Sequence, residues 1–147
     1  MSRNAISPIL VVLFLFLITP QLATAQQMPR SESAEGAVIY IISPNDGDVV
    51  TSPVTVKFGL KGMGVAPAGT SYAKTGHHHL LVDVEELPDL GKPIPADLNH
   101  LHFGGGQTEH DLVLPPGTHT LQLVLGDRAH VPHKPALVSE KITITVK

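Results

Sequence analysis

The sequence predicts an all-β protein, an immunoglobulin-like β-sandwich of about seven strands. From residue 38 onward, short apolar stretches are separated by turns rich in glycine and proline. Several of these stretches place an apolar residue at every second position, which is the period of a strand with one buried face. None of them has the period of an amphipathic helix. A jelly roll or a small barrel is the alternative architecture.

The first half of the domain contains three predicted strands. Residues 38–42 (VIYII) are β-branched and aromatic, and turn-forming residues follow them at once. Residues 54–60 (VTVKFGL) alternate between apolar and polar side chains. The glycine-rich segment 61–76 lacks this alternation and predicts a long loop. It leads into a third strand over residues 78–84.

The second half contains three further strands and one doubtful strand. Residues 85–99 hold three prolines, which predicts a loop or a poor edge strand. Residues 107–114 and 118–125 predict two strands joined by a sharp turn. Residues 126–137 predict a second long loop, and residues 138–146 end the chain with apolar side chains at even spacing.

The N-terminus has the pattern of a secretory signal peptide over residues 1–25. Arg3 precedes an unbroken apolar run, residues 9–18, and an A-x-A cleavage signal ends at Ala25. An uncleaved anchor is the alternative, but the run is short for a membrane span. We therefore expect a periplasmic or secreted protein with no membrane span after cleavage. Its flexible leader is residues 26–37, and its single domain is residues 38–147.

Charge and cysteine content restrict the function. The formal net charge is −3, and the predicted signal peptide carries one basic and no acidic residue. The exported part is thus more acidic still, which argues against nucleic acids and anionic membranes as partners. There is no cysteine, so no disulfide supports the fold. We expect the core alone, or the core with a bound metal, to stabilise it.

Histidine is the most informative residue type, since the chain has nine. Imidazole is the commonest side-chain metal ligand. In an immunoglobulin-like sandwich, alternate loops emerge at the same end. Loop 61–76, the region after residue 99 and loop 126–137 should therefore meet, and each brings a histidine. The predicted metal ligands are His77, His79, His102, His130 and Asp127.

Strand geometry divides the His77-His78-His79 triplet. His77 and His79 should point the same way, and His78 should face the core with Leu80. Imidazole sites without thiolates suit Cu(II), Zn(II) or Ni(II), and we favour copper or zinc. Whether His78, His100 and His133 join the site is left open, and Met63 in the loop 61–76 is the only thioether placed to contribute.

Two histidines are predicted to lie away from the site. His119 should sit where a corner residue bonds the turn before residues 118–125, and His110 should lie on the surface. Both belong toward the opposite end of the sandwich.

Several motif blocks resemble those of an exported bacterial family described as domain of unknown function 4399. The blocks are residues 43–47, 76–83, 102–109, 116–123 and 126–130. The resemblance extends over about residues 38–147. It implies a single exported domain and assigns no reaction and no ligand.

Other functions remain as alternatives. The histidines of an accessory domain of the cell envelope would form a hydrogen-bonded loop cluster and hold no metal, with Asp127 fixing its own loop. A metal-dependent hydrolase is less favoured, because the sequence shows no nucleophile constellation. We therefore predict no catalytic residue.

Overall fold

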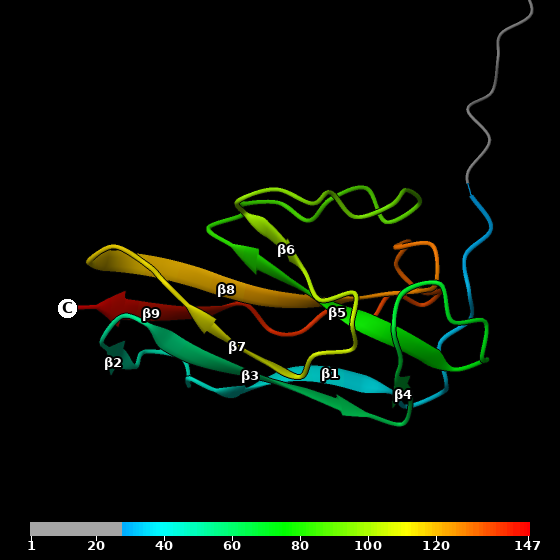
Figure 1. The fold of residues 1–147 in the computed structure, drawn as a ribbon, viewed down its shortest axis with the longest axis horizontal. Helices are drawn as coiled ribbons and strands as arrows, with labels where there is room; N and C mark the ends of the chain where they lie inside the picture. Colours follow the sequence, from blue (N-terminus) through cyan, green and yellow to red (C-terminus); the bar gives the residue numbers. More distant parts are fainter. Residues whose placement is uncertain (1–27) are drawn as a thin grey trace, which may run out of the picture.

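Residues 28–147, which the computed structural model describes, form two β-sheets packed face to face (Figure 1). The smaller sheet has the order β1 (Val38–Ser43), β3 (Val54–Lys61), β7 (Glu109–Leu112). The larger sheet has the order β2 (Val49–Val50), β9 (Ile142–Val146), β8 (Gly117–Gly126), β5 (Thr75–Val82), β4 (Gly64–Val65), and β6 (His100–His102) also pairs with β5. The predicted all-β sandwich is confirmed.

The pairing follows the immunoglobulin-like pattern. Antiparallel ladders join β1 to β3 and β3 to β7 in one sheet, and β5 to β8 and β8 to β9 in the other. The chain crosses between the sheets after β1, because β2 pairs in parallel with β9. Residues 85–99 contain no strand, so the doubtful strand is not formed there. The next residues form β6, which lies beside β5 in the larger sheet.

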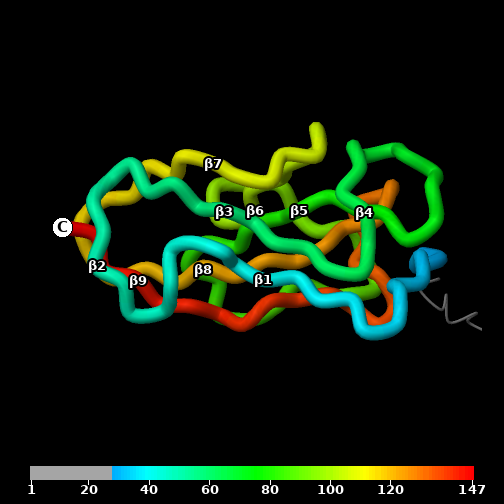
Figure 2. Tube along the Cα trace, turned by 90° about the horizontal axis from the view of Figure 1, so that it is seen from below, coloured from blue at the N-terminus to red at the C-terminus, as the bar shows by residue number. Residues whose placement is uncertain are grey.

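Three segments that are distant in sequence lie at one end of the sandwich. The predicted loop 61–76 contains the short strand β4 and runs into β5, which begins at Thr75. This segment and the predicted loop 126–137 gather at the end opposite the C-terminus (Figures 1 and 2). Residues 28–37 lie at the same end, drawn in blue beside the orange loop.

The predicted signal peptide, residues 1–25, and residues 26–27 of the predicted leader lie outside the described part of the chain. Within the rest of the leader, Glu32 forms a β-bridge with Lys134. This portion of the leader is therefore attached to the domain. Between residues 28 and 147 there is no helix long and apolar enough to cross a membrane.

The core lies between the two sheets and confirms the alternation read from the sequence. Leu80 on β5 and Leu121, Leu123 and Leu125 on β8 are fully buried and pack with Val56 on β3. Burying a side chain of this size stabilises the fold by about 1.5–3 kcal/mol. In a chain without cysteine, this apolar contact holds the sheets together.

The outer face of the larger sheet is covered as well. Leu81 and Val124 point away from the main core and pack with Ile94 of the proline-rich loop. The Ile94 amide donates a hydrogen bond to the His130 carbonyl, N–O 2.9 Å. The loop therefore lies over the sheet and contacts the segment that carries His130.

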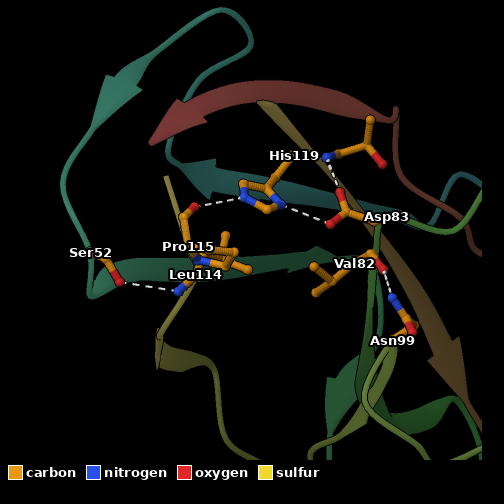
Figure 3. A network of polar contacts seen from close by, with 8 residues as sticks. Ser52, Val82, Asp83, Asn99, Leu114, Pro115 and His119 are labelled. Atoms are coloured by element: carbon orange, nitrogen blue, oxygen red, sulfur yellow. Dashed lines mark hydrogen bonds and ion pairs between the residues drawn. The ribbon is translucent and has the colours of Figure 1, made fainter. Parts of the chain in front are cut away.

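His119 forms the predicted corner at the opposite end (Figure 3). Its Nε2 lies 2.9 Å from the Pro115 carbonyl oxygen, and its Nδ1 lies 2.8 Å from Asp83 Oδ2. Asp83 Oδ1 also accepts the Thr120 amide at 2.8 Å. These bonds tie the end of β5 to the start of β8, so the structural role predicted for His119 is confirmed. His110 is exposed, as predicted.

Candidate metal centre

Four imidazoles from three separate segments converge on one point. His77 and His79 lie on β5, His102 lies on β6, and His130 lies in loop 126–137. Each offers one ring nitrogen, and these four atoms all lie within 4.8 Å of one another. They are four of the five metal ligands predicted from the sequence.

The strand period of β5 places its two histidines. Residues at i and i+2 share a face, so His77 and His79 both point to the outer face of the larger sheet. Their side chains are fully buried there. His78 points to the other face, where its ring centroid lies 5.2 Å from that of Phe58. The division of the triplet predicted from the sequence is therefore observed.

His102 reaches the site through strand pairing. We expected it in a loop, but it lies on the three-residue strand β6, directly opposite His79 in the antiparallel register. Because opposite residues share a face, its imidazole lies beside that of His79, with the ring centroids 5.0 Å apart. The sequence His100-Leu101-His102 does alternate, but three residues are too few to predict a strand.

His130 is held in a left-handed backbone conformation, with φ of +65°. Such a conformation is uncommon for a residue other than glycine, although histidine tolerates it better than most. The loop around it is fixed by Asp127. Asp127 Oδ1 accepts the amides of Ala129 and Val131 at 2.9 and 3.1 Å, and its carbonyl accepts the His130 amide at 2.9 Å.

The ring nitrogens are spaced for a shared cation. His77 Nε2 lies 3.1 Å from His79 Nε2 and 3.1 Å from His130 Nδ1. In a tetrahedral zinc site with bonds of about 2.0 Å, neighbouring nitrogens lie about 3.3 Å apart. These two distances are close to that value, and the other pairs among the four ligand atoms lie within 4.8 Å.

The ring nitrogens that face one another can be joined either by hydrogen bonds or by a shared cation. A neutral imidazole carries one N–H and one lone pair. The buried Nδ1 atoms of His77 and His79 have no hydrogen-bond partner among the described residues. Protons on these Nδ1 atoms leave the Nε2 lone pairs facing one another, and a cation between them would satisfy both. The donor set thus fits a bound metal ion.

Burial lowers the pKa of three of the clustered histidines, His77, His79 and His102. Burial, with the neighbouring imidazoles, lowers the pKa of His77 to about 4, although Asp127 partly opposes the shift. Burial and the same neighbours lower the pKa of His79 to about 3. Burial also lowers the pKa of His102, and the neighbouring His130 imidazole adds to the shift. Metal ligands must be deprotonated, and these rings already are at pH 7.

Two glycines make room for the rings. A Cβ atom at Gly104 would lie 2.6 Å from His102 Nε2, and one at Gly126 would lie 2.9 Å from His79 Nε2. Both distances are shorter than a side chain tolerates. The close approach of backbone to imidazole therefore requires glycine at these positions.

Asp127 lies outside the group of four. In addition to the Ala129 and Val131 amides, its carboxylate accepts the amide and hydroxyl of Ser31 at 3.2 and 2.8 Å. It is buried, and all of these bonds fix backbone or loop. Asp127 thus fixes its own loop, which was the alternative to the metal-binding role predicted for it.

The histidines left open by the sequence also lie outside the group. His133 Nε2 lies 3.1 Å from the Thr75 carbonyl oxygen, which ties the loop to β5. His100 Nδ1 lies 2.9 Å from Asp97 Oδ1. Met63 is turned away, since its sulfur accepts the Ala34 amide at 3.4 Å.

Comparison with known proteins places the chain in a family. The family described as domain of unknown function 4399 matches residues 56–147, more than half of the sequence. The chain belongs to this family. The domain of unknown function 4399 segment includes all four clustered histidines, whereas β1 and residues 28–37 precede it. No curated protein and no solved structure matches the chain.

Proposed function

We propose that this domain is an exported binding module in which His77, His79, His102 and His130 hold one transition-metal ion, copper or zinc. The observation that carries the proposal is the convergence of four ring nitrogens within 4.8 Å, from three segments distant in sequence. The export part of the proposal rests on the signal-peptide pattern of residues 1–25.

The chemistry of the donors selects the metal. A set made only of imidazoles suits Cu(II) and Zn(II), whereas Cu(I) prefers thiolates and thioethers. Four protein ligands close a tetrahedral zinc site, while catalytic sites keep a position open for water. The arrangement therefore favours holding an ion, for buffering, delivery or sensing, over turning over a substrate.

The second candidate is an accessory domain of the cell envelope with no metal. It is supported by the 3.1 Å spacings between His77, His79 and His130, which are also hydrogen-bond distances. In this case the cluster would be purely architectural, and an envelope protein would be the partner.

Metal content decides between the two. The full chain is expressed without a tag, collected from the periplasm and compared with His79→Ala and with His110→Ala, in which an exposed histidine is removed. We expect about one copper or zinc per chain in the wild type and in His110→Ala, and loss of the metal in His79→Ala. A wild type that stays empty after incubation with both metals would favour the accessory domain.

A further inference from the structure

The segment of residues 30–33, which we call the strap, lies against the loop that carries His130 (Figure 1). The Arg30 guanidinium donates from Nε to the Pro132 carbonyl at 2.8 Å and from a second nitrogen to the His133 carbonyl. The Lys134 amide donates to the Ser31 carbonyl at 2.9 Å. The strap and the loop therefore pair along their backbones like neighbouring strands.

Ser31 connects the strap to the candidate metal centre. Its hydroxyl and its amide both donate to Asp127 Oδ2, at 2.8 and 3.2 Å. The other oxygen, Oδ1, accepts the amides of Ala129 and Val131, the residues on either side of His130. A continuous set of hydrogen bonds thus runs from Ser31 through the Asp127 carboxylate to the backbone on either side of His130.

His130 needs such support. Its φ of +65° is a conformation that persists only when the surrounding structure determines it. The carboxylate is buried, and without the Ser31 hydroxyl its Oδ2 would keep only the longer bond from the Ser31 amide. The carboxylate would then be held less firmly, and the backbone around His130 with it.

We propose that the strap is a positioning element for the metal centre, with Ser31 acting through Asp127 to hold His130 in ligand geometry. This inference rests on the proposed function. All four ligands lie within residues 56–147, which match the family, and the strap precedes that segment. Metal affinity is therefore set in part by residues outside the segment that supplies the ligands.

The test compares Ser31→Ala with Ser31→Thr, which keeps a hydroxyl, and with Ser33→Ala. Ser33 is buried in the same strap, and its amide donates to the Lys134 carbonyl at 3.2 Å, away from Asp127. Each full-length protein is titrated with Cu(II), and its electron paramagnetic resonance spectrum is recorded. Hydrogen bonds made directly to metal ligands contribute about 10-fold to 100-fold in affinity, and Ser31 acts one bond further out, so we expect an effect near the lower end, about 10-fold.

We expect Ser31→Ala to weaken copper binding by about that factor and to lose one nitrogen coupling from the spectrum. Ser31→Thr should restore both, and Ser33→Ala should change neither. If the wild type binds copper and Ser31→Ala binds it equally well with the same spectrum, the strap has no positioning role.

Failure of the proposed function would appear differently, because the wild type would then bind no copper. Hydrogen exchange of the metal-free proteins decides the role of the strap in that case. Ser31→Ala should speed exchange at the Ala129 and Val131 amides and leave the Leu80 amide unchanged. Unchanged exchange at Ala129 and Val131 would overturn the inference.

Discussion

His79 and His102 are direct register partners on adjacent antiparallel strands, and their imidazole centroids lie 5.0 Å apart. Opposite residues of such a pair share one face of the sheet. Two charged imidazoles at this distance would repel, whereas two neutral imidazoles can share a cation. The pairing of β5 with β6 therefore brings His102 into the group of four histidines.

Gly104→Ala should weaken metal binding without removing a ligand. The new Cβ would lie 2.6 Å from His102 Nε2, and the exposed His102 ring can swing away to relieve the clash. We expect the affinity for zinc to fall to the level of His102→Ala in calorimetric titrations. Gly105→Ala is the matched control, since its Cβ would meet only the exposed side chain of Gln107. Equal affinities of Gly104→Ala and wild type would contradict the proposed role of His102.

His78→Leu should stabilise the protein and leave metal binding unchanged. His78 is fully buried beside Phe58, and neither of its ring nitrogens has a hydrogen-bond partner among the described residues. Replacing such a group with an apolar one of similar size removes a desolvation cost of about 1–3 kcal/mol. Urea unfolding of the metal-free protein measures the gain. Destabilisation would indicate that the imidazole has a polar partner in solution.

Acidification should destabilise the metal-free protein below about pH 6.5. Burial lowers the pKa of His78 to about 4, although the Gln107 backbone, close but outside hydrogen-bonding geometry, opposes the shift. Burial and neighbouring imidazoles lower the pKa of His77 to about 4 and of His79 to about 3. As the pH falls, the unfolded chain therefore binds protons before the folded chain does. The free energy of unfolding decreases accordingly.

Each of these histidines should cost about 1.4 kcal/mol per pH unit between its unfolded and folded pKa values. The difference in the free energy of unfolding between pH 7.5 and pH 5 measures the summed contribution of these histidines. His78→Leu should reduce the difference by about one histidine's share. A wild type equally stable at both pH values would contradict the burial of the triplet.

His119 should stabilise the protein more in acid than in alkali, which is the opposite of the pH dependence expected for the buried triplet. The loss of stability in His119→Gln should therefore be larger at low pH. The hydrogen bond to Asp83 raises the pKa of His119, burial opposes it, and the Pro115 carbonyl adds to it. The stabilisation is therefore complete below the unfolded pKa and is lost as the pH rises through the folded one. We expect the substitution to destabilise the protein by about 1–3 kcal/mol in mild acid and by less in alkali. Thermal unfolding at pH 6 and pH 9 is the measurement, and a larger loss at pH 9 would contradict the charged pair.

The sequence predicted the parts of the site that local periodicity controls. A period of two puts His77 and His79 on one face and His78 on the other, and the loop order of the fold brings His130 toward them. The position of His102 depends on which strand residues 100–102 pair with, and a long-range partner leaves no mark in three residues. Likewise, a carboxylate that binds metal and one that binds amides look the same in sequence, so the sequence could not distinguish the two roles for Asp127.

The four histidines differ in their exposure to solvent, and this difference bears separately on the affinity of the proposed centre and on its rate of ion release. His77 and His79 are fully buried, His130 is partly covered, and His102 is exposed. An ion leaves a protein stepwise, and the first bond to break is the one whose ligand can rotate into solvent. The buried pair would then set how tightly the ion is held at equilibrium. The single exposed ring would set how fast the ion passes to an acceptor, so tight retention and rapid hand-over would reside in different residues.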